Sequence, residues 1–575
     1  MKKLLLLSLL LISSYLLSAQ DRQAAYEMNE RLGRGMNMGN AFEAPSEESW
    51  GNPWKPEYFS MISELGFTHV RLPIRWEPAN RSMATAPYTI YPEFLERIKT
   101  VIDEALKNKL HIIINMHHHE DLIANPTGQK ERFLSQWRQI ADYFKSYPDS
   151  LLFEVLNEPN GKLTPELWNQ FAADAVSEIR KTNPDRTIML GTAEWGGIGG
   201  LNYLQLPNDD NIIVAIHYYN PFEFTHQGAE WTEPSSPTGV KWHDTEDERK
   251  TMQNEFKTVK EFSVNNNIPV HIGEFGSYSK ADIDSRVRWT TYLARWFEEQ
   301  GYSWAYWEFS AGFGIYNPAT GKFSEPLVNA LLHNLMPEPA KVEYSTIYKS
   351  NFENNTDGWA LYTQSPASGV LSNHNNQLEA TVTVKGSEGW HLQLVKNGIP
   401  LEEDEMYRFS FITSSSVQNN FVNYIGRNSD PWNAYSGYNS VNAGTQEEKL
   451  TYTFTMKQPD DASARIVFDI GTINPSTVVF KEITVDKIKI TPTSIQEVNS
   501  PDRILFYPNP VNNELFVDNN GAYNKVTIYS LGGNKLTTYS IYAGKNRIDM
   551  NNLKPGVYLI SFEGDTMQTK KLIKK

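Results

Sequence analysis

Two glutamates stand at the ends of apolar, β-branched segments that lie far apart in the chain. Glu158 follows Asn157 in the segment LLFEVLNEPN, and Glu274 lies in the segment VHIGEFG. An ionised carboxylate is costly to remove from water, so packing does not explain an acid at the end of an apolar strand. Two carboxylates that face each other across a cleft can protonate a leaving oxygen and attack an anomeric carbon. The pair therefore predicts cleavage of a glycosidic bond.

Eight short apolar runs between residues 22 and 340 provide the elements that would bring the two acids together. Amphipathic stretches separate these runs, with apolar residues at the three- and four-residue spacing of helices. Eight strand–helix repeats in about 300 residues predict an α/β fold, an eight-stranded parallel TIM barrel. The alternative is an open doubly wound sheet, but no glycine-rich phosphate loop follows the first run. The runs are GRGMNMGN, HVRLPIRW, HIIINMHHH, LLFEVLNEP, TIMLGT, NIIVAIHYYN, PVHIGEFG and YSWAYWEFS.

The active site of such a barrel lies where its strands end, at the carboxyl face. In this chain the runs end in a ring of polar residues and one tryptophan. This ring consists of Asn37, Asn40, Glu43, Arg71, His117, His118, His119, Asn157, Glu158, His217, Tyr219, Glu274, Trp307 and Glu308. A soluble core has no packing use for so many polar side chains at one edge, so they predict a site.

Roles follow from the chemistry of each group. We interpret Glu158 as the acid/base and Glu274 as the nucleophile, which Arg71 and Tyr219 would keep ionised by charge and by hydrogen bonding. Asn157 would bond the sugar 2-hydroxyl, a contact that strengthens in the transition state. His117 and His217 would hold hydroxyls or orient the carboxylates, while Trp307 offers a flat face to a pyranose ring and Trp231 extends the cleft.

Each role has a structural alternative. Glu158 can fix a loop at the end of the barrel, Glu274 can pair with Arg71 in a salt bridge, and either tryptophan can be a core residue. The run of histidines at 117–119 can be a metal cluster, but neighbouring strand residues point to opposite sides, so only His117 and His119 would converge. The acids stand beside Asn, Pro and Gly rather than in an acidic ligand set. We therefore expect no metal and no cofactor.

Charge and termini restrict the partners and the location. The chain has 575 residues and a net charge of −15, which argues against nucleic acid and fits a neutral polymer. Residues 1–19, MKKLLLLSLLLISSYLLSA, read as a signal peptide, and no other stretch approaches the ~20 apolar residues of a membrane span. The chain contains no cysteine, so its stability must come from packed cores. We expect a secreted, extracellular or cell-surface monomer.

The second half of the chain predicts β structure. Residues 345–495 show short alternating strands with Asn, Ser, Gly and Thr turns, which predict an all-β jelly-roll sandwich. Residues 500–575 predict a small all-β domain that ends in the basic tail KKLIKK. The predicted domains are thus 1–19, 22–340, 345–495 and 500–575.

The barrel segment resembles glycoside hydrolase family 5, a large group of retaining β-glycanases. The motifs NEP, HYY and GEFG carry the resemblance, and PFEFTHQGAEW is similar to a subgroup of cellulases with mannanase side activity. The resemblance implies Glu158 as acid/base, Glu274 as nucleophile, and double displacement with retention. It also implies supporting or substrate-binding positions at Asn40, Glu43, Arg71, His117, His118, Asn157, His217, Tyr219, His226, Trp231 and Trp307.

The two β segments resemble accessory domains of such enzymes. Residues 345–495 are similar to carbohydrate-binding modules, whose candidate aromatics here are Trp359, Trp390, Trp432, Tyr435 and Tyr438, with Trp432 the best candidate for an exposed platform. The tail, with FYPNPVNNEL, KPGVYLI and KKLIKK, resembles the sorting domain of the type IX secretion route. That resemblance implies the type IX machinery as a partner during export.

Three hypotheses for the function remain open. The first is a secreted endo-acting β-1,4-glucanase, a cellulase whose partner is a β-linked polysaccharide. The second is a β-1,4-mannanase or a mixed glucan, mannan and xyloglucan hydrolase, because the same catalytic groups serve both and subsite loops decide. The third is a non-catalytic glycan-binding surface protein, whose mark would be the loss of one glutamate; both are present.

Overall fold

The computed structural model describes residues 22–232, 234, 236–493, 504–507, 511–519, 521–564 and 567–574. The segment 1–19, predicted to be a signal peptide, lies outside the described residues. Residues 339–493 form one compact unit, and the other described residues belong to a second unit. The domain boundaries 22–340, 345–495 and 500–575 stay predictions.

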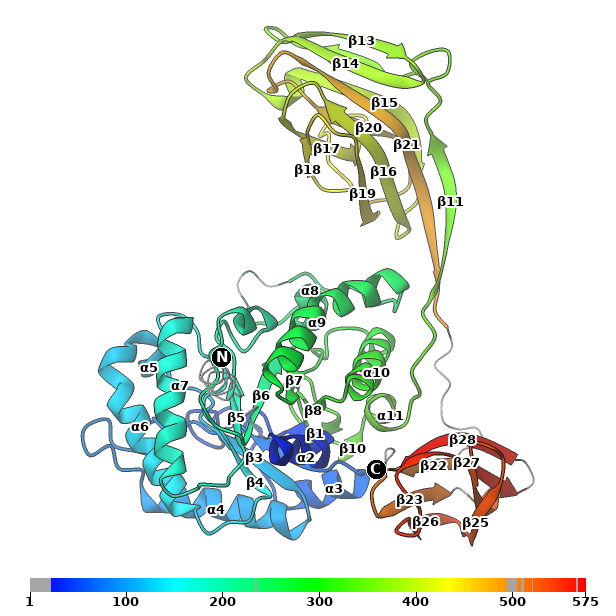
Figure 1. Ribbon diagram of the computed structural model, residues 1–575. Coiled ribbons are helices and arrows are strands. Elements are labelled where there is room, and N and C mark those ends of the chain that lie inside the picture. The colour runs from blue at the N-terminus through cyan, green and yellow to red at the C-terminus, as the bar shows by residue number, and fades with distance from the viewer. Residues whose placement is uncertain are drawn as a thin grey trace, which may run out of the picture. The chain divides into compact units, whose positions relative to one another are not determined.

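Eight parallel strands close into a barrel, each paired with the next along the chain (Figure 1). The first and last strands close the ring, because Met36 pairs with Tyr306. The predicted TIM barrel is therefore confirmed. The strands are β1 (Arg34–Asn37), β2 (His69–Leu72), β3 (His111–Asn115), β4 (Leu151–Glu154), β5 (Ile188–Gly191), β6 (Ile212–His217), β7 (Val270–Phe275) and β8 (Ser303–Tyr306).

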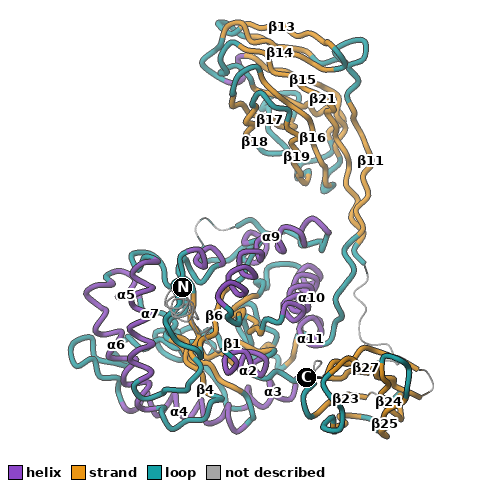
Figure 2. The backbone as a smooth tube through the Cα atoms, viewed as in Figure 1, coloured by secondary structure: helices purple, strands orange, loops and turns teal. Residues whose placement is uncertain are grey.

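Helices surround the barrel strands (Figure 2). Proline in the first turn begins four of the described helices, where its missing N–H costs nothing. Thr245 and Glu248 form a capping box at the start of α9. The helices are α2 (Gln23–Leu32), α3 (Glu57–Leu65), α4 (Pro92–Lys107), α5 (Glu120–Ala124), α6 (Pro126–Tyr143), α7 (Pro165–Arg180), η1 (Ile198–Asn202), α8 (Phe222–Thr225), α9 (Glu246–Asn266), α10 (Ile283–Gln300) and α11 (Glu325–Leu332).

The amino end of the barrel is closed by α2. Its residues Ala25, Met28 and Leu32 form one buried apolar cluster with strand residues that include Ile113 and Leu152. This apolar cluster packs α2 against the strands of the barrel. The polar residues at the carboxyl ends of the strands remain as the place for a site.

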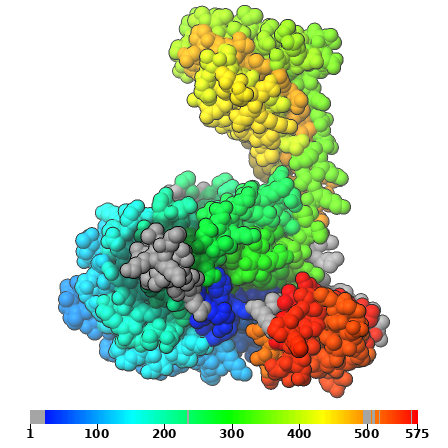
Figure 3. Space-filling model, in the orientation of Figure 1, coloured from blue at the N-terminus to red at the C-terminus, as the bar shows by residue number. Residues whose placement is uncertain are grey.

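Residues 339–493 form the predicted β-sandwich. One sheet has the order β13-β14-β21-β16-β19 with β11 added beside β21, and the other has the order β12-β15-β20-β17-β18. Apolar side chains from the two sheets pack into one core, and Figure 3 shows one outer face of this sandwich in light green to orange. The strands are β11 (Lys341–Lys349), β12 (Ala360–Thr363), β13 (Ser368–His374), β14 (Gln377–Val384), β15 (Leu392–Leu401), β16 (Met406–Ser415), β17 (Asn419–Gly426), β18 (Asn439–Ala443), β19 (Glu448–Thr455), β20 (Asp461–Asp469) and β21 (Ser476–Thr491).

The C-terminal residues form the small β domain that the sequence predicts. Its sheets have the orders β22-β23-β26 and β25-β24-β27-β28 and share a small apolar core. The strands are β22 (Ile504–Tyr507), β23 (Glu514–Asn519), β24 (Tyr523–Ser530), β25 (Lys535–Ser540), β26 (Gly544–Asp549), β27 (Gly556–Gly564) and β28 (Met567–Lys574). Among the helices that the structure describes, none combines the length and apolar composition that a membrane span requires.

Candidate active site

A buried arginine at the end of β2 organises the carboxyl face of the barrel. Arg71 donates Nη1–H to Glu274 Oε1 at 2.8 Å and Nη2–H to Asn157 Oδ1 at 2.5 Å. It also donates from Nε and Nη2 to the two oxygens of Glu154 at 2.6 and 2.7 Å. One guanidinium thus fixes side chains from β4, β7 and the loop after β4. With its oxygen bound to Arg71, Asn157 presents its NH₂ group as a donor.

Glu154 is not among the site residues predicted from the sequence. This residue ends β4 and is buried, and Arg71 lowers its pKa even though burial acts in the opposite direction. Its signal in the sequence was an acid inside the apolar run LLFEV, because a buried strand carboxylate requires a cation. Glu154 accepts two of the hydrogen bonds of the guanidinium, so Arg71 is a partner of Glu154 as well as of Glu274.

Glu158, His217 and Glu274 converge at the barrel mouth. Each contributes one ligand atom to a group whose members all lie within 4.8 Å of one another. His217 Nδ1 lies 2.8 Å from Glu158 Oε1 and 3.6 Å from Glu274 Oε2, and the Tyr219 hydroxyl donates to Glu274 Oε2 at 2.9 Å. The side chain of Glu158 is 29% exposed and that of Glu274 is 6% exposed. One carboxylate therefore faces the cleft, and the other is held inside.

Burial and charge act against each other in this group. Burial alone would lower the pKa of His217, but Glu274 and Glu158 raise it above the ordinary 6.5. Burial raises the pKa of Glu274 above its ordinary 4.5, against the opposing effect of His217 and Arg71. A proton on His217 Nδ1 is therefore held between two carboxylates. Tyr219 has a raised pKa because of burial and remains a hydrogen-bond donor.

Two carboxylates and an imidazole at this spacing can also hold a metal ion. Here, however, Glu274 already accepts hydrogen bonds from Arg71 and Tyr219. A second cation beside the buried guanidinium would be repelled by it. The surroundings of the pair therefore favour carboxylate chemistry.

The histidines at 117–119 lie beyond the end of β3, where strand alternation does not apply. The strand ends at Asn115, so alternation does not govern residues 117–119. The rings of His117 and His118 lie 4.8 Å apart, and His117 stacks on Trp307 at 5.6 Å with an angle of 10°. His119 instead accepts a hydrogen bond at Nδ1 from the backbone at the start of α5. Among the described residues, the group whose ligand atoms lie close enough to hold a metal ion contains none of these three histidines.

Two further acids lie buried beside this group. The carboxylate of Glu43 accepts N–H groups from Asn40 and Ala41. The carboxylate of Glu308 accepts backbone N–H groups from the loop at 310–313. Burial raises the pKa of Glu43 to about 8 and that of Glu308 to about 7. Both therefore retain protons at pH values where ordinary glutamates have lost them.

The free energy of unfolding should fall as pH rises from 4.5 to about 8, because of the raised pKa of Glu43. A carboxyl with a folded-state pKa above its unfolded value binds a proton that the unfolded chain has released, so folding takes up protons between pH 4.5 and about 8 for Glu43. We expect the melting temperature to fall by several degrees between pH 5 and pH 9. In Glu43→Gln the slope should be flatter, whatever the absolute stability. The exposed Glu48, changed to Gln, is the control; an unchanged slope in Glu43→Gln would contradict the assignment.

Two cavities flank Glu158. One, of about 890 Å³, is lined by Glu158, His217, Tyr219, His226 and Trp231, together with Trp195. The other, of about 230 Å³, is lined by Glu158, Asn157 and the three histidines after β3. The structure thus places His226 and Trp231, the two site residues predicted on the loop after β6, in the first cavity. Trp195 is not among the site residues predicted from the sequence, because its segment TAEWGG contains no recognisable motif.

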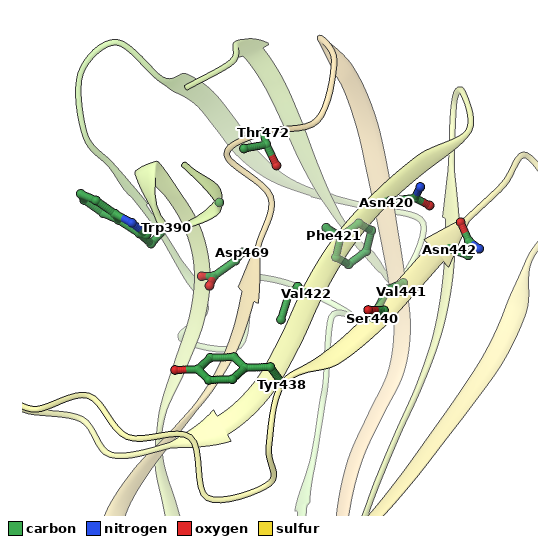
Figure 4. Close-up of a pocket in the computed structure, with 11 residues that line it drawn as sticks. Trp390, Asn420, Phe421, Val422, Tyr438, Ser440, Val441, Asn442, Asp469 and Thr472 are labelled. Carbon is green, nitrogen blue, oxygen red and sulfur yellow. The ribbon is translucent and has the colours of Figure 1, made fainter. Parts of the chain in front are cut away.

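A third cleft lies on residues 339–493. It has a volume of about 580 Å³ and lies on the sheet that contains β17, β18 and β20 (Figure 4). Trp390 and Tyr438 stand on its sides, and Asn420, Asn442 and Asp469 provide polar groups (Figure 4).

Two of the candidate aromatics in this unit have other roles. Trp359 is 3% exposed and belongs to the core, so it was wrongly predicted as a platform. Tyr435 packs against the same core. Trp432 is exposed, but the Arg465 guanidinium lies 4.4 Å from the centre of its ring, and Trp432 does not line the cleft. The cleft is therefore walled by Trp390 and Tyr438 instead.

Comparison with known proteins places this geometry in a family. Residues 32–312 match the description cellulase (glycosyl hydrolase family 5). Endoglucanase B of Clostridium cellulovorans is 30% identical over 313 residues, which make up 49% of this chain and 69% of that protein. The chain belongs to glycosyl hydrolase family 5. The resemblance carried by NEP, HYY and GEFG is confirmed, and the family-5 segment coincides with the barrel.

Other relatives agree with this membership. Endoglucanase H of Acetivibrio thermocellus is 36% identical over 54% of this chain, but the chain spans 33% of that relative's length. A solved structure of endoglucanase Cel5A from Thermotoga maritima is 50% identical, with a TM-score of 0.52, and covers 53% of this chain and 99% of that one.

The rest of the chain matches two further descriptions. Residues 344–477 match a carbohydrate binding domain, and residues 505–575 match a secretion system C-terminal sorting domain. Both resemblances drawn from the sequence are confirmed. The sorting domain indicates export or attachment at the cell surface.

Proposed function

We propose that this family-5 protein is a secreted, endo-acting β-1,4-glucanase that hydrolyses plant polysaccharide with retention of configuration. The carboxylate pair carries the proposal, because oxygens of Glu158 and Glu274 lie within 4.8 Å of each other. Retaining enzymes place their two carboxyl groups about 5–5.5 Å apart, whereas inverting enzymes leave about 6.5–9.5 Å for a water molecule. The spacing therefore supports a double displacement.

The environments of the two acids support distinct roles. Glu158 is the more exposed and lies 2.8 Å from His217 Nδ1, which suits the group that must protonate the leaving oxygen and later activate water. Glu274 is buried and held by Arg71 and Tyr219, which suits the group that attacks the anomeric carbon. Trp307, stacked on His117, offers its ring to the pyranose at the reaction centre.

Cavities on both sides of Glu158 support cleavage within a chain, because a polymer can continue past the reacting unit in both directions. The preference between glucan and mannan depends on subsite contacts. Solved structures of Thermotoga maritima Cel5A hold cellobiose or mannotriose. A β-1,4-mannanase or mixed glucan, mannan and xyloglucan hydrolase is therefore the second candidate activity.

Proton NMR of the reaction tests the mechanism. When cellotetraose is cut in deuterated buffer, we expect the β-anomer of the new reducing end to appear first and the α-anomer only later by mutarotation. A double displacement forms a covalent intermediate and then inverts it again, so configuration is retained. Initial release of the α-anomer would contradict the proposal.

The same protein should be assayed on carboxymethylcellulose, glucomannan, mannan and xyloglucan. An endo-acting enzyme lowers the viscosity of the soluble polymer before much reducing sugar is released. Release of reducing sugar from none of these substrates would favour the non-catalytic glycan-binding alternative.

We also propose that residues 339–493 bind polysaccharide in the cleft between Trp390 and Tyr438. Aromatic rings on the sides and amide and carboxylate groups on the floor fit the apolar faces and hydroxyl edges of a sugar chain. Burial raises the pKa of Asp469, whose carboxylate accepts a hydrogen bond from Gln393 at 2.7 Å. A well-anchored acceptor at the floor supports recognition of sugar hydroxyls.

Affinity electrophoresis in gels that contain soluble β-glucan tests this cleft. The full chain with Glu274→Gln should be retarded, and adding Trp390→Ala should reduce the retardation about tenfold in apparent affinity, because one stacking wall is lost. Trp432→Ala in the same background is the matched control, since Trp432 is exposed but does not line the cleft. Loss of binding in the control but not in Trp390→Ala would contradict the proposal.

For the route of export, we propose the type IX secretion machinery as the partner that recognises the C-terminal sorting domain at 505–575. The mature protein would then act as a monomer, extracellularly or at the cell surface. Deletion of residues 505–575 should trap the protein inside the producing cell, which fractionation would show.

A further inference from the structure

A further cavity of the barrel lies between the loop after β6 and α9, outside the group around Glu158. We call it the outer cavity. A wall of aromatic side chains with a few polar groups, around a volume of about 300–1,000 Å³, is typical of a ligand site. The outer cavity fits this description. It has a volume of about 370 Å³, and its wall includes Tyr218, Asn220, Phe222, Trp242, Thr251 and Glu255.

The outer cavity continues the 890 Å³ cavity that contains Glu158. The two cavities share Tyr218, Asn220, Phe222 and Glu255 in their walls. A polymer that fills the first cavity can therefore pass Phe222 and enter the second. This continuity favours a further part of the polysaccharide chain over an unrelated small molecule as the ligand.

The Phe222 ring is fixed at the boundary between the two cavities. It stacks on His226, with 4.1 Å between the ring centres and an angle of 10°, and Phe222 remains 45% exposed. An aromatic ring that is held in place and still exposed suits the apolar face of a pyranose. A sugar chain can thus pass this boundary in contact with protein.

The charge of the wall restricts the ligand further. Glu223, Glu248 and Glu255 line the outer cavity, and no lysine or arginine of the described residues lines it. An anionic ligand would be repelled by these carboxylates, whereas a neutral sugar would not.

Glu255 provides an acceptor in this wall. Its Oε2 accepts hydrogen bonds from the Tyr218 hydroxyl at 2.8 Å and from Asn220 Nδ2 at 3.1 Å. Within the part of the chain that the structure describes, no group donates to Oε1. The two donors therefore hold the carboxylate in place and leave one oxygen for a ligand hydroxyl.

Trp242 provides a donor in the same wall. Trp242 is 4% exposed, and its indole N–H has no hydrogen-bond acceptor among the described residues. Buried polar groups are nearly always paired, so an unpaired donor in the wall of a cavity needs an explanation. A sugar hydroxyl both accepts and donates, and it would satisfy the indole of Trp242 and the free oxygen of Glu255.

We propose that the outer cavity is a distal subsite, which binds a sugar unit of the same polysaccharide chain beyond the units held at Glu158. This inference rests on the proposed function and extends the length of chain that the protein binds. The Trp242 indole donates to a hydroxyl oxygen of that unit, and Glu255 accepts from a hydroxyl of the same unit. The subsite strengthens the binding of long chains and contributes nothing to the binding of short substrates.

The test fills the outer cavity and compares a long substrate with a short one. Thr251 is exposed on α9 and lines the outer cavity but not the cavity at Glu158. We expect Thr251→Trp to lower kcat/KM for cellohexaose about fivefold, the effect of one or two lost hydrogen bonds. The loss should come from a higher KM with kcat unchanged, and kcat/KM for an aryl β-cellobioside should stay at the wild-type value.

A second variant removes the donor without filling the cavity. Trp242→Phe keeps an aromatic ring and leaves no acceptor of the described residues unpaired, because the indole N–H has none. We expect kcat/KM for cellohexaose to fall about threefold, the effect of one hydrogen bond. The value for the aryl β-cellobioside should again be unchanged.

Asn254→Trp is the matched control for Thr251→Trp, because Asn254 is exposed on the same helix and lines neither cavity. It should match the wild type on both substrates. If the wild-type protein hydrolyses neither substrate, the proposed function fails. If the wild type is active and both variants equal or exceed it on cellohexaose, the inference is overturned. Equal losses on the two substrates in both variants also overturn it, because the effect would then lie at the reaction centre.

Discussion

Glu274→Ala will lose hydrolysis by ~10⁴-fold or more in kcat, because the covalent route through this carboxylate disappears. The Glu274 side chain contributes little to the binding of the polymer, so the alanine variant should keep its affinity for the polymer. The measurement is steady-state turnover of an aryl β-cellobioside, alongside binding to β-glucan. Wild-type turnover in this variant would end the assignment of Glu274 as nucleophile.

Azide separates the roles of the two acids by stereochemistry. In Glu274→Ala a small anion can enter the space left by the carboxylate and attack from the same face, which should give an α-glycosyl azide. In Glu158→Ala the covalent intermediate still forms from a substrate with a good leaving group, and azide then attacks from the opposite face to give a β-glycosyl azide. Identical products from the two variants would contradict the assigned pair.

The barrel could be predicted from the sequence because its signal is periodic and local. Each of the eight apolar runs ends at the same edge of the sheet, so polar residues separated by more than a hundred positions, such as Glu158 and Glu274, meet at the barrel mouth. The carboxyl ends of the parallel strands lie at one face of the barrel, whatever the sequences of the loops. The motifs NEP and GEFG then identify the reacting groups.

Features that depend on side-chain partners could not be predicted in this way. Glu154 stands in an apolar strand, and only the structure shows that it takes two hydrogen bonds of Arg71. Strand alternation does not apply to His119, because β3 ends at Asn115. The sequence does not distinguish Trp359 from Trp390, but Trp359 is buried in the core of the sandwich and Trp390 lines a cleft. Burial is a property of the packed fold and not of a short segment.

The role predicted for Arg71 also changes in emphasis. We expected this residue to keep Glu274 ionised, but burial raises the pKa of Glu274 while the pKa of Glu154 is lowered. Arg71 therefore acts mainly as the fixed cation of a buried network that holds Glu154, Asn157 and Glu274 in register. Its removal should harm the fold as well as the reaction.

Arg71→Met should destabilise the barrel by about 3–5 kcal/mol, because it leaves the buried carboxylates of Glu154 and Glu274 without their cation. Turnover should fall with it, since Glu274 and Asn157 lose the group that positions them. Calorimetry of the barrel transition measures the first effect. Adding Glu154→Gln should recover part of the stability, because one uncompensated charge is removed, but should not recover turnover.

Arg249→Met provides a matched control. Arg249 forms a buried two-bond pair with Asp244, at 2.7 Å for each bond, and neither residue belongs to the group around Glu158. This control should lose stability and keep the kcat of the remaining folded enzyme. An Arg71→Met protein with wild-type stability would contradict the proposed network.

The stability difference between the wild type and Arg71→Met should depend on pH. The depressed pKa of Glu154 in the wild type stabilises the fold above the unfolded value near 4.5, and this contribution is lost as pH falls through the folded value. Without Arg71, only the smaller effects of His217 and Asn115 oppose burial, so the pKa of Glu154 rises and its carboxylate takes up a proton more readily as pH falls. The stability gap between wild type and Arg71→Met should therefore narrow from pH 7 to pH 5, whereas simple loss of packing would leave that gap constant.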